Sequence, residues 1–170
     1  MERYFVAASE DNPKKEAVRA GRFARVRQDH AREMAEDYAE MILDLEGDQA
    51  ASVRPAALAR ALGVSHVTVL RALERLTRDG ILVRLDQGVQ LSPRGRRLGE
   101  SSRNRHRLVV AFLESLGVPP EVAAVDGEGI EHHVSSVTLE CLADHLIRNG
   151  WGVAAPVPGI PQQEWQGPEP

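Results

Sequence analysis

The fold of this chain is decided by residues 57–65, which read Ala57-Leu58-Ala59-Arg60-Ala61-Leu62-Gly63-Val64-Ser65. Small Ala59 allows two helices to cross closely, and Gly63 permits a tight turn between them. Ser65 is an N-cap residue for a second helix over about 66–79, because its hydroxyl can accept a hydrogen bond from the first helical turn. The segment therefore predicts a helix-turn-helix.

A β-hairpin is predicted directly after the second helix. Ile81–Leu85 is an apolar run typical of a strand, residues 86–88 form a turn, and Val89–Leu91 is the returning strand. Ser92-Pro93 then starts another helix, which runs through Leu98. Helix, tight turn, helix and hairpin is the order of a winged helix-turn-helix, whose second helix lies in the major groove of DNA.

Helices are also predicted on both sides of this unit. Apolar residues recur at intervals of three and four over Gln28–Leu45, which is the period of an amphipathic helix. Four shorter helices are expected over residues 55–62, from Ser102 to Leu116, from Pro119 toward Val134, and from Ser135 or Ser136 to Arg148. The fold class is therefore mainly α, with a winged helix-turn-helix domain followed by an all-helical domain.

These elements divide the chain into four expected segments. A flexible N-terminal arm occupies residues 1–27, and the winged helix-turn-helix domain occupies residues 28–100. The helical domain follows at 101–149, and a Pro-rich disordered tail at 150–170 ends the chain.

Basic residues are concentrated in one part of a chain whose formal net charge is −4. Residues 52–110 hold 12 Lys and Arg against 4 Asp and Glu, whereas the rest holds 9 against 21. Such clustering is the electrostatic footprint of DNA binding, although a solvated charged surface has the same composition. The candidates for base or phosphate contact are Ser65, His66, Thr68, Arg71, Arg75 and Arg84. Further candidates for phosphate contact alone are Arg94, Arg96 and Arg97.

Composition and absent motifs limit the other function classes. Cys141 is the single cysteine, which excludes an internal disulfide framework and a Cys-rich zinc site. The chain shows no signal-peptide pattern and no apolar run of about 18 residues, so we expect a soluble, cytoplasmic protein. It has no HExxH motif and no obvious nucleophile–base pair, so we do not expect an enzyme.

Carboxylates and imidazoles recur at helical spacing in two places. Two sets at intervals of three and four would each share one helix face: Asp37 with Glu40, and Glu128 with Glu131 and His132. His106 lies near the start of the helix between them. Clustered carboxylates repel one another, and a bound cation would relieve that repulsion. Carboxylates with imidazoles are hard ligands, which suit manganese or ferrous iron.

Each of these patterns also has a simpler explanation. Asp37 and Glu40 alone are more often a solvated face, and a surface position would explain His106, which lies between two arginines. The crowded stretch 128–133 is more distinctive, and there a metal site is favoured over surface charge.

Three motifs resemble the diphtheria toxin repressor (DtxR) family of metalloregulators, specifically its manganese-responsive branch. They are Asp37-Tyr38-Ala39-Glu40, Arg105-His106-Arg107-Leu108-Val109 and Asp126-Gly127-Glu128-Gly129-Ile130-Glu131-His132-His133-Val134-Ser135. Residues 88–95 are similar to the wing of this family, and the resemblance covers about residues 28–149. The family often has a Pro after the first residue of its recognition segment. Ser65-His66-Val67-Thr68 has none, which leaves the operator sequence open.

The resemblance implies a homodimeric transcription regulator, with repressor activity, that binds a double-stranded DNA operator and controls manganese homeostasis genes. The implied ligands of a manganese pair, two Mn²⁺ per chain, are Asp37, Glu40, His106, Glu128, Glu131 and His132. Iron-responsive relatives have Cys at the position of Glu128, so this residue favours manganese. Metal bound between the two domains would fix the dimer for operator binding.

The residues leave three alternatives open. The first is a winged-helix regulator with a different effector, either iron or a small molecule. The second is a metalloenzyme built on the same cluster, although this short helical chain leaves little room for the shaped cleft that hydrolysis needs. The third is a helical adaptor that only dimerises, which would leave the basic second helix and hairpin unexplained.

Overall fold

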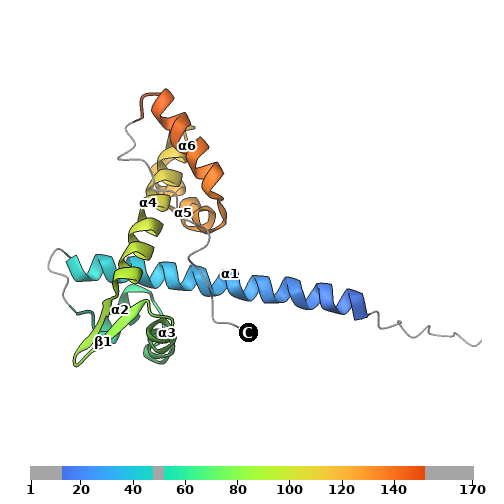
Figure 1. Cartoon of the computed structure of the whole chain (residues 1–170). Coiled ribbons are helices and arrows are strands. Elements are labelled where there is room, and N and C mark those ends of the chain that lie inside the picture. Colours follow the sequence, from blue (N-terminus) through green and yellow to red (C-terminus); the bar gives the residue numbers. More distant parts are fainter. Residues whose placement is uncertain (1–12, 48–51, 152–170) are drawn as a thin grey trace, which may run out of the picture.

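The computed structural model describes residues 13–47 and 52–151, which form a mostly helical fold with one small hairpin (Figure 1). In chain order the elements are α1 (Pro13–Glu46), α2 (Pro55–Ala61), α3 (His66–Arg78), β1 (Leu82–Leu85), β2 (Gly88–Leu91), α4 (Pro93–Ser115), α5 (Pro120–Ile130), the 3₁₀ helix η2 (Glu131–His133) and α6 (Ser136–Arg148). Among the described helices, none is by itself long and apolar enough to cross a membrane. The bent pair α2 and α3 passes that test only when taken together, by length and composition.

The predicted helix-turn-helix and hairpin are both present. Gly63 adopts a positive φ of 65° in the turn between α2 and α3, a conformation that favours glycine. Ser65 caps α3, and its hydroxyl accepts a hydrogen bond of 3.1 Å from the backbone N–H of Thr68. Strands β1 and β2 pair antiparallel, with Leu82 opposite Leu91. The winged helix-turn-helix interpretation of residues 55–91 is thereby confirmed.

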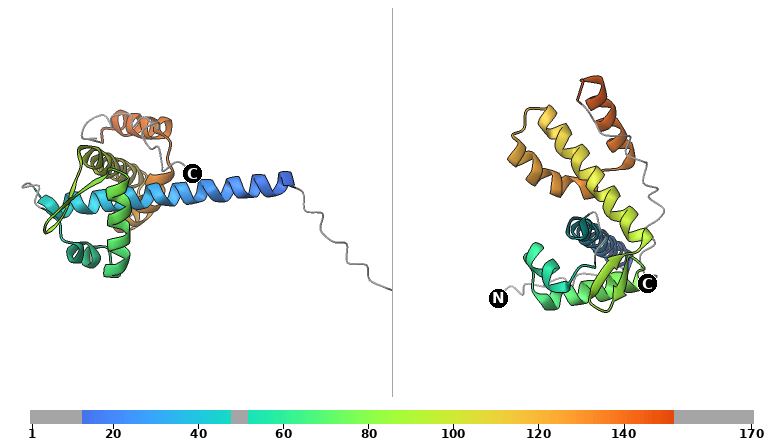
Figure 2. Two further views of the ribbon diagram at one scale, coloured as in Figure 1. Left: turned by 60° about the horizontal axis from the view of Figure 1, so that its bottom comes forward. Right: turned by 90° about the vertical axis from the view of Figure 1, so that its left-hand side faces the viewer.

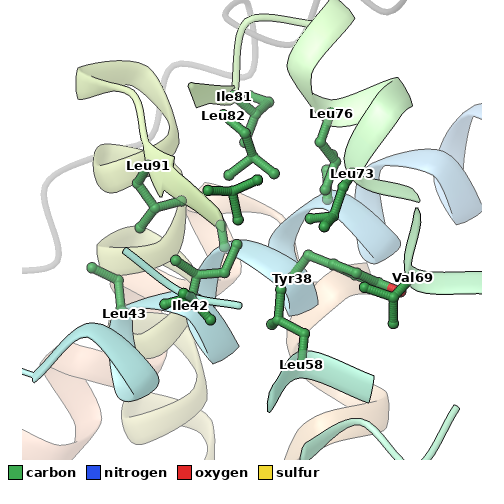
Figure 3. Close-up of a cluster of buried hydrophobic side chains, with 14 residues drawn as sticks. Tyr38, Ile42, Leu43, Leu58, Val69, Leu73, Leu76, Ile81, Leu82 and Leu91 are labelled. Atoms are coloured by element: carbon green, nitrogen blue, oxygen red, sulfur yellow. The ribbon is translucent and has the colours of Figure 1, made fainter. Parts of the chain in front are cut away.

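A hydrophobic core joins α1 to the helix-turn-helix and to the hairpin (Figure 3). Tyr38 and Ile42 of α1 meet Leu58 of α2, Leu73 of α3 and Leu82 of β1, and all five are buried. Burying one such side chain contributes about 1.5–3 kcal/mol. The C-terminal half of α1 is therefore an integral part of the winged domain, as the apolar period of residues 28–45 predicted.

The helix α1 begins much earlier than predicted. It starts at Pro13, so residues 13–27 are helical, and the predicted start at Gln28 and a flexible arm reaching residue 27 are wrong for this stretch. Figures 1 and 2 show this half of α1 extending beyond the other elements. The sequence of this stretch lacks the apolar period on which the prediction relied, although its Lys, Glu, Ala and Arg residues favour helix intrinsically. Residues 1–12 and the predicted tail from residue 152 lie outside the described residues.

The helix α4 is continuous, whereas two helices were predicted around it. It runs from Pro93 to Ser115, so the predicted break between Leu98 and Ser102 is wrong, and the domain boundary predicted at residue 100 falls inside one helix. Gly99, Ser101 and Ser102 are weaker helix formers than the residues around them, but they lie where α4 packs across α1, and tertiary packing stabilises a helix more than propensity does.

Beyond the crossing with α1, α4 carries the all-helical second unit (Figure 1). Leu108 and Val109 of α4 form a small core with Leu139 and Leu146 of α6. Ser135 caps α6, and its hydroxyl accepts a hydrogen bond of 3.2 Å from the backbone N–H of Thr138. The chain between α4 and α6, formed by α5 and η2, returns toward α1 and there completes the site described next.

Candidate metal centre and DNA-binding surface

The crossing of α1 and α4 brings together all six candidate ligands. Asp37 and Glu40 come from α1, His106 comes from α4, and the remaining three come from α5 and η2: Glu128, Glu131 and His132. Residues far apart in the sequence thus lie close to one another at this crossing.

Ion pairs connect these side chains. The Nε2 atom of His132 lies 3.2 Å from Oδ1 of Asp37 and 3.6 Å from Oε1 of Glu131. The Nδ1 atom of His106 lies 2.9 Å from Oε2 of Glu131 and 3.6 Å from Oε1 of Glu128. Glu131 is therefore the centre of the cluster, between the two imidazoles.

Local backbone structure explains why these residues meet. The predicted helix from Pro119 does not continue to Val134 but ends at Ile130, and the 3₁₀ helix η2 follows. In η2, Glu131 is buried beside α4 while His132 reaches α1. Gly127 allows α5 to lie close to α4, because a Cβ atom at Gly127 would be only 2.7 Å from a methyl group of Val110, whereas its distance of 3.5 Å from Cε1 of His106 would be an ordinary contact.

Burial and charge perturb the titration of this cluster. Burial raises the pKa of the Glu131 carboxyl, against the lowering effect of the two imidazoles. Burial likewise raises the pKa of Glu40. The charge of His106 and a hydrogen bond with Ser102 oppose this increase only in part. Burial disfavours the charged form of His132, but hydrogen bonds to Asp37 and Glu36 outweigh it and raise the pKa of His132 to about 10. His132 is consequently protonated at neutral pH in the metal-free cluster.

The donor set fits a hard divalent cation by its chemistry. The buried atoms Nδ1 of His106 and Oε2 of Glu131 lie 2.9 Å apart, yet neither makes a hydrogen bond. Two buried ligand atoms without a hydrogen bond are costly, and a cation between such atoms would satisfy both. As the described side chains stand, no three His, Cys, Asp or Glu residues are arranged to hold a metal ion. The imidazoles and carboxylates are instead paired with one another, so a cation would have to replace those pairs.

A buried carboxylate that sequence reasoning missed, Glu36, contacts this cluster at His132. Glu36 of α1 is 1% exposed, and its Oε2 atom lies 2.8 Å from Nδ1 of His132 and 2.8 Å from a guanidinium nitrogen of Arg105. Arg32 donates to its other oxygen at 3.0 Å. Burial alone would raise the pKa of Glu36, but the hydrogen bond from His132 and the charges of Arg105 and Arg32 lower it to about 2.

The sequence did contain a signal for this pair. Glu36 lies on the same face of α1 as buried Ala39 and Leu43, and Arg105 lies on the same face of α4 as Ser102 and Val109, which are also buried. Opposite charges on the buried faces of two helices indicate an ion pair between them, because an unpaired buried charge is strongly unfavourable.

The predicted DNA-contacting residues lie on α3 and the wing. His66, Thr68 and Arg71 are exposed on α3, and Arg84 is exposed on β1. Arg75 is half-buried and lies 3.7 Å from Asp79, while the hydroxyl of Ser65 is already engaged with Thr68 in the cap. Arg96 is paired with buried Glu46 at 2.6 Å, and Arg94 donates to the carbonyl oxygen of Asp79, whereas Arg97 is exposed.

Comparison with protein families matches both halves of the described chain. Residues 30–86 match the N-terminal DNA-binding domain of iron-dependent repressors. Residues 92–148 match the metal-binding and dimerisation domain of the same repressors. Residues 87–91, which contain β2, separate the two matched regions, and the candidate ligands come from both regions.

Individual relatives agree with this assignment. The transcriptional regulator MntR of Salmonella typhimurium is 44% identical over 129 residues, which are 75% of this chain and 82% of that protein. The HTH-type transcriptional regulator MntR of Lysinibacillus sphaericus is 36% identical over 110 residues, 64% of this chain and 78% of the relative.

Solved structures show the same fold. A manganese-dependent transcriptional repressor in complex with manganese is similar with a TM-score of 0.60 at 28% identity, over 74% of this chain and 58% of that one. The manganese regulator SloR is similar with a TM-score of 0.61 at 25% identity, over 72% and 56%. This chain thus spans little more than half of either solved chain. Taken with the two matched domains, these likenesses show that the chain belongs to the iron-dependent repressor (DtxR) family, as a metal-dependent, DNA-binding transcription regulator and not an enzyme.

Proposed function

We propose that this protein is a manganese-responsive repressor of manganese homeostasis genes, which acts in the cytoplasm as a homodimer and binds two Mn²⁺ per chain. The proposed ligands are the six clustered residues Asp37, Glu40, His106, Glu128, Glu131 and His132. The observation that carries this proposal is the convergence of four carboxylates and two imidazoles from four separate elements around the buried pair of His106 and Glu131. Such hard donors suit manganese, and relatives named MntR support the same choice.

The proposed ligands fall into two groups with different freedom to move. Three ion pairs, at successive positions along α4, connect this helix to α1. They join Glu36 with Arg105, Asp44 with Arg103, and Glu46 with Arg96. Asp37, Glu40 and His106 are consequently fixed relative to one another before a cation arrives. The other three ligands come from α5 and η2. The ion pairs of these elements to α1 run through His132, which a cation would recruit, and through the exposed pair of His133 with Glu33. Metal binding would therefore fasten the segment 120–133 to the crossing of α1 and α4.

Fixing the position of α5 and η2 in this way would regulate DNA binding by the dimer. The region matching the dimerisation domain carries exposed apolar side chains near and beyond the metal cluster: Leu116, Val122, Val125, Ile130, Val137 and Ile147. We place the dimer interface on this surface, because burial of apolar area drives association. In a two-fold dimer, the position of α5 and η2 relative to α1 would then set the distance between the two α3 helices. That distance must match the spacing of the operator half-sites.

Ferrous iron is the alternative effector that one observation favours, since both matching family models describe iron-dependent repressors. Mn²⁺ and Fe²⁺ prefer similar hard ligands, so the donor set alone does not separate them. Glu128 distinguishes them through the resemblance described above, because iron-responsive relatives have Cys at its position. Measurement of operator affinity with each metal at equal free concentration, under anaerobic conditions, tests this choice.

The first experiment is a titration of metal-free protein with Mn²⁺, in which EPR measures the free ion. We expect uptake of about two equivalents per chain, by analogy with paired-metal sites. Glu131→Gln, which removes the central charge, should abolish uptake of at least one equivalent. Glu140→Gln, an exposed carboxylate on α6 away from the cluster, is the matched control and should bind as the wild type does. No uptake by the wild type at micromolar concentration would refute the manganese proposal and leave the winged-helix regulator with another effector.

A further inference from the structure

Glu36 is a fully buried carboxylate that contacts a proposed ligand, His132, at the ring nitrogen facing away from the other candidate ligands. Its Oε2 atom lies 2.8 Å from Nδ1 of His132, while Nε2 of the same ring faces Asp37 at 3.2 Å and Glu131 at 3.6 Å. The two ring nitrogens thus have different surroundings. One meets a carboxylate buried between two helices, and the other meets the half-exposed cluster of candidate ligands.

Two arginines hold Glu36 in place. Arg105, which is 2% exposed, lies 2.8 Å from Oε2, and Arg32 donates from Nε to Oε1 at 3.0 Å. Glu36 cannot rotate away from His132 without leaving the buried guanidinium of Arg105 without its carboxylate partner, which is strongly unfavourable. The direction in which Glu36 presents its oxygen to His132 is therefore set by α4 as well as by α1.

We propose that Glu36 is a positioning residue for the metal centre, which fixes the His132 ring so that Nε2 is the ligand atom and Nδ1 donates to the Glu36 carboxylate. This inference rests on the proposed function, because it assumes that His132 is a ligand. A carboxylate that accepts from the second nitrogen of a ligating imidazole fixes the orientation of its ring and increases its basicity. Loss of such a partner lowers metal affinity by about 10- to 100-fold.

A neighbouring pair provides a matched control. Glu33, one turn before Glu36 on α1, lies 3.4 Å from Nε2 of His133, the residue next to His132. That pair has the same residue types and joins the same two elements, but the His133 side chain is 66% exposed. A general effect of removing an α1 carboxylate that pairs with η2 would appear in both variants. A positioning effect would appear only in the variant of Glu36.

The test uses full-length protein labelled with ¹⁵N-histidine and loaded with ¹¹³Cd²⁺, a diamagnetic probe whose scalar coupling identifies the ligating nitrogen. In the wild type, we expect coupling from ¹¹³Cd to Nε2 of His132 and a slowly exchanging Nδ1–H proton on the same ring. Glu36→Gln should lower the affinity for Cd²⁺ and Mn²⁺ by about 10- to 100-fold and shift or remove that proton signal. Glu33→Gln should change neither the affinity nor the signal.

A second variant and a measurement on the wild type separate loss of positioning from loss of folding. Glu36→Asp keeps the charge for Arg105 and Arg32 but withdraws the oxygen from His132, so it should lose affinity while the metal-free protein melts close to the wild type. Coupling from ¹¹³Cd to Nδ1 instead of Nε2 in the wild type would overturn the positioning role without any variant. Wild-type affinity in both Glu36 variants would also overturn it. Failure of the wild type to bind either metal would overturn the proposed function itself, and the positioning role with it.

Discussion

Gly99 of α4 lies directly against the backbone of Ala39 of α1. A Cβ atom at Gly99 would be 2.9 Å from both the carbonyl carbon and the carbonyl oxygen of Ala39, and 2.7 Å from a methyl group of Leu43. Backbone cannot move aside as the end of a side chain can, so this close approach requires glycine. The crossing places Glu40 of α1 within hydrogen-bonding reach of Ser102 of α4. The geometry of the metal cluster therefore depends on a contact that involves no ligand.

Gly99→Ala should separate α1 from α4 and weaken metal binding without changing any candidate ligand. Overpacking of a close contact costs about 1–3 kcal/mol, so thermal unfolding of the metal-free protein should shift to lower temperature. The Mn²⁺ affinity should fall in the same variant, because Asp37 and Glu40 would move relative to His106. Thermal unfolding followed by circular dichroism and the Mn²⁺ titration measure the two effects.

Gly129→Ala is the matched control for this substitution. Gly129 lies within α5 beside the candidate ligand Glu128, but a Cβ atom there would meet nothing within 4 Å. Alanine in a helix interior is favoured over glycine by up to about 1 kcal/mol, so this variant should be as stable as the wild type or more so. Equal loss of stability in both variants would contradict the role assigned to the crossing.

Metal uptake should release protons, and affinity should increase with pH. The pKa of His132 is raised to about 10 in the metal-free protein, chiefly because hydrogen bonds to Asp37 and Glu36 outweigh its burial. The ring is therefore charged over the whole range from pH 6 to 9, and a ligating imidazole must give up one proton. Lower pH favours the protonated, metal-free form. Calorimetric titration with Mn²⁺ in buffers of different ionisation enthalpy counts the protons, and an uptake without proton release would contradict the proposed role of His132.

The winged domain was predictable because its signals are local. The N-cap Ser65, the turn residue Gly63 and the apolar run of β1 each determine structure within a few residues, and each is present as expected. The start of α1 and the continuity of α4 depend on other causes. Residues 13–27 are helical although their sequence lacks the apolar period of an amphipathic helix, and α4 passes through Gly99 because it packs on α1. Neither cause is visible in a local pattern.

The candidate ligands are visible in the sequence for a similar reason, since helical spacing and the resemblance to a family both act on short motifs. Glu36 and Arg105 were missed although each lies on the face of its helix that is buried, because their pairing becomes evident only when α1 crosses α4. Each of these residues directly precedes a candidate ligand, Asp37 and His106 respectively. In a helix, neighbours in sequence point about 100° apart, so one faces the cluster while the other faces the opposite helix.

Arg71→Ala should weaken operator binding while leaving Mn²⁺ uptake unchanged. Arg71 is exposed on α3, the helix that a winged helix-turn-helix places in the major groove, and it is distant in the fold from the metal cluster. Loss of a phosphate contact reduces the slope of log affinity against log salt by about 1, whereas loss of a base contact costs about 1–3 kcal/mol and relaxes specificity. Fluorescence anisotropy with labelled operator at several salt concentrations separates these cases. Arg148→Ala at the end of α6 is the control, and unchanged affinity in Arg71→Ala would remove this residue from the interface.

Val125→Glu should convert the dimer to a monomer while leaving the winged domain folded. Val125 is 72% exposed in the middle of α5, within the region matching the dimerisation domain, and a buried unpaired carboxylate at an apolar interface is strongly unfavourable. Ile147→Glu on α6, where the residue is 63% exposed, should act in the same direction. Val83→Glu is the matched control, because Val83 is also an exposed valine but lies on β1 of the wing.

Sedimentation equilibrium should show monomers for Val125→Glu and Ile147→Glu and a dimer for Val83→Glu. Since operator half-sites are bound together only by a dimer, the monomeric variants should also lose most operator affinity even with Mn²⁺ present. If both variants remain dimeric, the interface lies elsewhere. The proposal that α5 and η2 set the distance between the two α3 helices would then be wrong.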